Sequence, residues 1–141
     1  MTAGANTNNR ADAATLNWID VNYDFYRRNY RVMVLLANTR VDDPTHNEFF
    51  ESLFERVRSD YRSMNFLWVQ PSSNPPEALQ GNETDPVGDP TYVQMFQGMT
   101  NFGVISVQRN IWPPMKIRID QNWNISVDQD KWFDEHTGLS T

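Results

Sequence analysis

Two short, unbroken apolar runs constrain the fold of this 141-residue chain more than any other feature. They occupy residues 32–37 and 66–69, and both are rich in residues that favour strands. Uninterrupted runs of this length are typical of strands covered on both faces, whereas a strand with one exposed face alternates apolar and polar residues. The runs therefore predict two buried strands, over residues 31–37 and 65–70.

The segment between the two runs carries the pattern of an amphipathic helix. Asp43 precedes Pro44, which fits an N-cap residue followed by proline at the first helical position, and Thr45 with Glu48 offers a competing capping box. We predict a helix over residues 44–62 and, with the flanking strands, a central βαβ unit with parallel strands. The predicted core face of this helix is aromatic and aliphatic: Phe49, Phe50, Leu53, Phe54, Val57 and Tyr61.

The rest of the chain completes a predicted α/β or α+β single domain. Residues 1–14 show no periodicity and are expected to form an extended N-terminal arm. The single domain spans residues 15–136, and residues 137–141 are a tail. Alternating apolar and polar residues over 115–127 predict a C-terminal antiparallel hairpin that turns at residues 121–122.

The domain is expected to begin with a helix from Thr15. Leu16, Ile19, Tyr23, Tyr26 and Tyr30 recur at spacings of three and four, and Trp18, Val21 and Phe25 are expected to widen this buried stripe.

A change in composition marks residues 71–90, which hold five of the eight prolines. Proline lacks a backbone donor, so we predict a long loop there rather than a helix or strand. Loops of this length are often functional or bind a partner. After the loop, the Asp89-Pro90 pair predicts a short helix that continues to Met99, and residues 104–108 predict a third strand.

The composition excludes several classes of protein. A formal net charge of −6 disfavours nucleic acid as a partner, because binding phosphates requires a basic surface. The chain contains no cysteine, which excludes disulfides, thiolate catalysis and cysteine-ligated metals. Because no apolar run reaches the length of a membrane span, we expect a soluble protein, located in the cytoplasm or in a virion.

Candidates for catalysis and metal binding are weak. His46 is expected to be an exposed polar residue in the first turn of a helix, and His136 falls near the tail. An acidic C-terminal cluster departs from the calcium-loop pattern and is interpreted as solvated charge, with a small metal-dependent enzyme as the competing hypothesis. We therefore predict a non-enzymatic chain without cofactor or metal. The cluster comprises Asp128, Asp130, Asp134 and Glu135.

The candidate binding residues are those expected to contact other proteins. Ten of the twelve basic residues are arginine, which suits protein interfaces better than lysine does. One arginine cluster lies beside several aromatic residues, and the prolines of the long loop and of a later turn are accessible candidates. The predicted partner-binding residues are Arg27, Arg28, Arg31, Pro75, Pro76, Pro86, Trp112 and Pro113.

The predicted order of elements resembles that of thioredoxin over residues 31–127. In that fold a redox cysteine pair opens the helix after the first central strand, here around residues 44–47, and a cis-proline precedes a later strand, at the place of Pro114. Both cysteines are missing here. The resemblance therefore implies a divergent, redox-inactive thioredoxin-like domain that binds an extended peptide near Pro114.

These observations favour a structural or adaptor function. The long proline-rich loop, the excess of arginine and the lack of a catalytic constellation are typical of a chain that acts through protein–protein contacts. The main expectation is a structural or adaptor subunit of a larger assembly, such as a virion, a phage neck or tail, or a secretion machine. Its expected partners are other protein subunits, copies of itself included.

Overall fold

The computed structural model describes residues 3–72, 91–107 and 115–129. Side chains within these ranges are described except at residues 3–11, 91–92, 115 and 128–129. In chain order the elements are α1 (Ala3–Asn29), β1 (Val32–Leu36), the 3₁₀ helix η1 (Pro44–His46), α2 (Asn47–Arg58), β2 (Asn65–Pro71), β3 (Thr91–Val93), the 3₁₀ helix η3 (Phe96–Gly98), β4 (Phe102–Val107), β5 (Met115–Ile119) and β6 (Ile125–Gln129).

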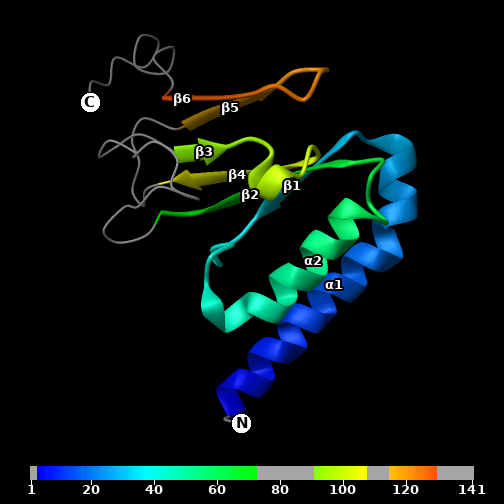
Figure 1. The fold of residues 1–141 in the computed structure, drawn as a ribbon, viewed down its shortest axis with the longest axis vertical. Helices are drawn as coiled ribbons and strands as arrows, with labels where there is room; N and C mark the ends of the chain where they lie inside the picture. Colours follow the sequence, from blue (N-terminus) through cyan, green and yellow to red (C-terminus); the bar gives the residue numbers. More distant parts are fainter. Residues whose placement is uncertain (1–2, 73–90, 108–114, 130–141) are drawn as a thin grey trace.

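A mixed four-stranded sheet in the order β1-β2-β4-β3 forms the centre of the fold. Strands β1, β2 and β4 are parallel, and β3 pairs antiparallel with β4. Helices α1 and α2 lie side by side on one face of the sheet, and the β5–β6 hairpin lies on the other (Figure 1). The predicted α/β single domain, its central βαβ unit and its C-terminal hairpin are confirmed.

The larger core lies between the helices and the sheet. Aromatic rings from α2 pack against β2 and β4, with Phe54 and Phe102 at 5.3 Å and Phe50 and Trp68 at 5.2 Å between ring centroids. Leu53 and Val57 are completely buried in the same cluster. Each fully buried side chain of this kind contributes about 1.5–3 kcal/mol, so this aromatic face is a main source of stability.

A second, smaller core lies between the sheet and the β5–β6 hairpin. Leu67 and Ile105 from the sheet meet Trp123 and Ile125 from the hairpin. Gly103 allows this close approach, because a Cβ atom there would lie 3.1 Å from the Ile125 side chain. The predicted turn of the hairpin is also confirmed, with Asp120 accepting the backbone N–H groups of Asn122 and Asn124.

Helix α1 begins much earlier than the sequence pattern predicts. It starts at Ala3, so the extended arm expected over residues 1–14 is wrong for residues 3–14. This segment contains several alanines, the best helix former, and it needs no apolar periodicity because it lies beyond most of the sheet (Figure 1). The periodic pattern begins only where the helix reaches the core, at Leu16 and Ile19.

The short helix predicted to continue to Met99 is also wrong in part. Residues Thr91–Val93 form β3, and only Phe96–Gly98 are helical, in a single 3₁₀ turn. The register places Val93 opposite Val104 in β4, so pairing with the neighbouring strand overrides the local helical signal.

The thioredoxin-like alternative is not supported by the topology. The antiparallel pair β5–β6 forms a separate sheet and does not extend the central one, whose three long strands are all parallel. Pro114, the position compared with the cis-proline, lies outside the described residues, as do the predicted tail and most of the proline-rich loop.

Candidate functional site

Strand β1 forms an edge of the central sheet, and one side of its backbone has no partner strand in the described structure. The Arg31 carbonyl accepts the Asn65 N–H at 3.0 Å, and the Ala37 N–H donates to the Val69 carbonyl at 2.8 Å. Backbone groups alternate in direction along a strand. The N–H and C=O groups of Val32, Val34 and Leu36 therefore point away from β2.

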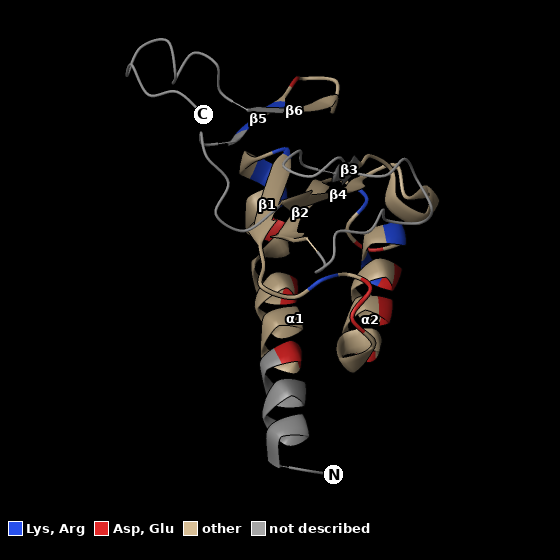
Figure 2. Cartoon of the chain, turned by 90° about the vertical axis from the view of Figure 1, so that its left-hand side faces the viewer, with Lys and Arg blue, Asp and Glu red and all other residues tan. Residues whose placement is uncertain are grey.

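Within the residues that the structure describes, the open edge of β1 lacks the features that normally prevent further strand pairing. Its sequence, VMVLL, contains no charged residue and no proline (Figure 2). Natural edge strands are usually protected by lysine, proline, a bulge or a covering element. Leu36 is 81% exposed and Val34 is 46% exposed. The prediction that this strand is covered on both faces is therefore wrong.

Helix α1 exposes a second apolar stripe next to this edge. Ile19 and Tyr23 are buried against the core, as predicted. Trp18, Val21 and Phe25, which the sequence pattern assigns to the same buried stripe, are between 50% and 70% exposed. Their spacings of three and four residues place them along one side of the helix.

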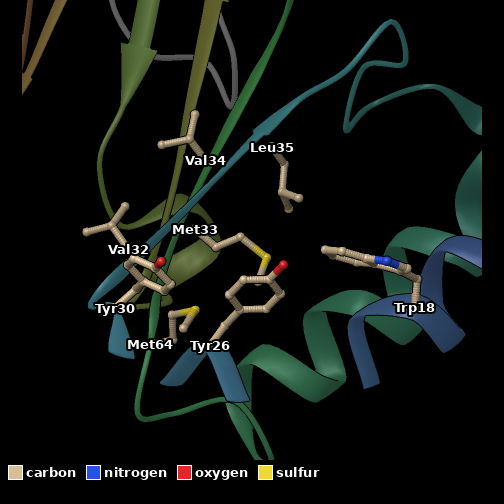
Figure 3. A pocket seen from close by; sticks show the side chains of 8 residues that line it. All are labelled: Trp18, Tyr26, Tyr30, Val32, Met33, Val34, Leu35 and Met64. Carbon is tan, nitrogen blue, oxygen red and sulfur yellow. The ribbon is translucent and has the colours of Figure 1, made fainter. Parts of the chain in front are cut away.

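A groove of about 260 Å³ lies between α1 and β1. Figure 3 shows Trp18 and Tyr26 projecting from the helix toward Met33 and Leu35 of the strand. The Tyr26 ring lies 5.8 Å from the Trp18 ring and 5.9 Å from the Tyr30 ring. We call the groove and its exposed neighbours the α1/β1 surface; the exposed members are Trp18, Val21, Phe25, Tyr30, Val34 and Leu36.

The opposite side of α1 is held against α2 by a polar cluster. Arg56 donates to both carboxylate oxygens of Asp20, at 2.9 and 3.0 Å, and the Tyr61 hydroxyl donates to the same carboxylate. The hydrogen bond from Arg56 lowers the pKa of Asp20 below its ordinary value, and the bond from Tyr61 acts in the same direction. Burial and the bond to Asp20 raise the pKa of Tyr61. This cluster orients α1 so that its apolar stripe faces away from α2.

The predicted arginine cluster borders the α1/β1 surface. Arg27 and Arg28 both pair with Asp24, whose single negative charge offsets part of their positive charge. Arg31 is exposed at the start of β1, next to Tyr30. The cluster is therefore placed at the end of the surface, and Asp24 offsets only part of its positive charge.

The other predicted partner-binding residues cannot be compared with this surface. They lie outside the described residues: Pro75, Pro76, Pro86, Trp112 and Pro113.

His46 differs from the sequence expectation of an exposed residue. Its Nδ1 atom lies 2.7 Å from a carboxylate oxygen of Asp12, and both side chains are partly buried. The pair faces a cavity of about 320 Å³ near the carboxyl end of β1. In the described structure this pair provides a polar contact between α1 and η1.

Metal binding finds no support within residues 3–72, 91–107 and 115–129. No group of three or more histidine, aspartate or glutamate side chains there could hold an ion. The acidic cluster at the C-terminus falls outside the described side chains. Among the described helices, none is both long enough and apolar enough to cross a membrane.

Comparison with protein-family models, curated proteins and solved structures finds no match for this chain. The functional interpretation therefore depends on the geometry of the chain itself. The sequence pattern points to the arginines at the end of α1 and assigns the apolar residues beside them to the core. The available signal was the width of the stripe, because Trp18, Val21 and Phe25 extend beyond what one buried helix face accommodates.

Proposed function

We propose that this chain is a non-enzymatic structural or adaptor subunit of a larger protein assembly, such as a virion, a phage neck or tail, or a secretion machine. It binds other protein subunits through the α1/β1 surface. The observation that supports this proposal is the unprotected edge of β1 beside an exposed aromatic helix stripe.

An open strand edge of this kind binds by accepting another strand. The incoming main chain forms hydrogen bonds with the outward N–H and C=O groups of Val32, Val34 and Leu36. Successive side chains of an added strand point to opposite faces of the sheet. Half of them would reach the groove beside Tyr26, and the other half would cover Val34 and Leu36. The main chain thus supplies affinity, and the two apolar faces supply specificity.

The chemistry of the surface favours a protein partner. Its exposed members are aromatic and aliphatic, and aromatic residues are enriched at the centres of protein interfaces. The net charge of −6 disfavours nucleic acid, and Asp24 offsets part of the positive charge of the neighbouring arginines.

The test expresses three tagged chains in the native source: the unaltered chain, Leu36→Lys and Met95→Lys. It measures how much of each chain enters a larger complex, using light scattering on the purified material. We expect the unaltered chain to enter a complex and Leu36→Lys to reduce its incorporation by about tenfold or more, since a charge at a strand edge opposes pairing. Met95→Lys is the matched control, because Met95 is a similarly exposed apolar residue away from β1. Equal incorporation of all three chains, or a partner-free chain throughout, would contradict the proposal.

A further inference from the structure

We propose that the occupant of the α1/β1 surface is a second copy of this chain. In this dimer the β1 strands pair antiparallel across a two-fold axis at Val34. This inference rests on the proposed function, because it takes the α1/β1 surface to be a protein interface, and it adds the identity and the register of the partner.

The outward groups of β1 are arranged for pairing with themselves. A two-fold axis at Val34 places Val34 opposite Val34 of the second copy, and Val32 opposite Leu36. All three residues direct their backbone N–H and C=O groups to the open edge, so each opposed pair is a hydrogen-bonded pair. At two bonds for each such pair the contact would form about six main-chain hydrogen bonds. The two four-stranded sheets would then become one continuous sheet.

The same axis brings the exposed stripes of the two α1 helices together. A two-fold axis perpendicular to the sheet keeps both copies of α1 on the same face, antiparallel to each other. Because the stripe of Trp18, Val21 and Phe25 lies on the side of α1 opposite the Asp20–Arg56 cluster, it faces the second copy. One symmetric arrangement therefore covers both the strand edge and the helix stripe.

The exposed area is close to what a dimer of standard size buries. A fully exposed aromatic side chain presents 150–250 Å², so the three exposed aromatic residues and the three exposed aliphatic ones together present on the order of 600 Å² per copy. A standard interface buries about 800 Å² per partner, and the main-chain contact of β1 adds to the side-chain area. The largest apolar patch on a typical monomer is about 300–600 Å², so the exposed side chains of this surface are at the upper end of that range.

The charges near the surface permit two copies of an acidic chain to meet. Asp20 is paired with Arg56, and Asp24 is paired with Arg27 and Arg28, so these carboxylates of α1 are neutralised locally. The net charge of −6 on each copy still produces a longer-range repulsion. Salt screens repulsion of this kind, with a Debye length of about 10 Å at 0.1 M. The dimer is therefore expected to tighten as salt is added.

The experiment measures the oligomeric state of the full chain by sedimentation velocity over a concentration series, at low and moderate salt. We expect a reversible dimer whose Kd falls with added salt. Leu36→Lys should raise the Kd by about tenfold or more, because it places a charge on each copy in an apolar contact. Met95→Lys should leave the Kd unchanged. The thermal melt of each variant establishes that it is folded.

The register is tested by a single cysteine, because the chain has none of its own. Residues opposed in a hydrogen-bonded antiparallel pair have Cα atoms about 5.5 Å apart, within the range of about 4.4–6.8 Å that a disulfide spans. Val34→Cys should therefore form a covalent dimer on mild oxidation or with a short bismaleimide. Met95→Cys should form no covalent dimer under the same treatment.

The possible results distinguish a failure of the dimer from a failure of the proposed function. A dimer that is weakened by Leu36→Lys and crosslinked at position 34 supports the second copy as the occupant. A dimer that is unaffected by Leu36→Lys overturns the inference, as does a chain that is monomeric at all concentrations. A further result is that the unaltered chain is monomeric on its own and still enters its native assembly, with Leu36→Lys abolishing that incorporation. In that case the proposed function holds and the partner is a different protein. If Leu36→Lys also leaves that assembly unchanged, both proposals fail.

Discussion

Strands β1 and β2 have similar sequences but very different environments. Both are short apolar runs, and the sequence pattern predicts that both are covered on both faces. β2 lies between β1 and β4, with the helices on one face and the hairpin on the other, and Phe66 and Leu67 are completely buried. β1 lies at the edge, where Val34 and Leu36 are exposed.

This difference shows that an apolar run indicates how much apolar surface of a strand needs to be buried. It does not indicate which neighbour buries that surface. For β2 the cover comes from the chain itself. For β1, the described structure leaves part of the apolar surface and half of the backbone groups uncovered. The excess of apolar residues in β1 therefore fits a contact made outside the chain, which is the basis of both proposals.

Leu67→Ala in β2 is expected to have the largest effect on stability. The side chain is fully buried between the sheet and the hairpin, so its removal should lower the free energy of unfolding by about 2–5 kcal/mol. Chemical denaturation monitored by circular dichroism would measure this loss. A loss below about 1 kcal/mol would show that the hairpin does not pack against β2 as described.

Gln70→Ala, at the end of β2, is expected to have the next largest effect. The Gln70 side chain accepts the Val41 N–H at 2.8 Å and donates to the Ser106 hydroxyl at 3.0 Å, in a completely buried position. Leaving a buried group without a partner costs about 1–3 kcal/mol. The same denaturation experiment would detect this change. Gln121→Ala in the exposed hairpin turn is the matched control, and an equal loss in both variants would contradict the role of the buried bonds.

Asp20→Asn tests the polar cluster that orients α1 so that its apolar stripe faces away from α2. The folded-state pKa of Asp20 is lowered, so its carboxylate stabilises the fold above its unfolded pKa of 3.8. We expect a loss of at most about 1 kcal/mol at neutral pH, since the ion pair is partly exposed to solvent. The difference from the unaltered chain should disappear as the pH falls through the folded pKa.

Thermal melts from pH 7 down to pH 2 would measure this dependence. Asp60→Asn, which makes the same change of charge at an exposed residue, is the control. A difference between Asp20→Asn and the unaltered chain that grows toward acidic pH would contradict the assigned direction of the shift.

Leu36→Ala in β1 is expected to have the smallest effect, although it makes the same chemical change as Leu67→Ala. At protein concentrations where the chain is monomeric, the free energy of unfolding should change by no more than about 0.5 kcal/mol, because the side chain is already in solvent. A loss comparable to that of Leu67→Ala would show that β1 is covered within the chain and would remove the basis for a docking edge.

Much of the fold could be predicted from local patterns. The strand predictions over 31–37 and 65–70 match β1 and β2, and the helix predicted over 44–62 contains η1 and α2. The N-cap at Asp43 is confirmed by its hydrogen bond from the Thr45 N–H at 2.9 Å. These features depend on short-range periodicity and capping, which residues near one another in the sequence determine.

The features that failed depend on helix propensity or on distant contacts, neither of which apolar periodicity records. The start of α1 was missed because a helix rich in alanine needs no apolar face. Strand β3 was missed because its structure comes from pairing with β4. For the candidate site, the sequence analysis found Arg27, Arg28 and Arg31 but assigned Trp18, Val21 and Phe25 to the core, because periodicity shows a helix face without showing how much of it is covered.

The sequence by itself therefore determined which segments of this protein are strands and helices, and which residues are apolar enough to need cover. Only the tertiary structure decided that β2 is central and β1 is an edge, because that choice depends on which strands pair and where the two helices and the hairpin pack. The same amino-acid pattern forms a buried core in one strand and an open docking edge in the other, since exposure is a property of neighbours and not of the run itself.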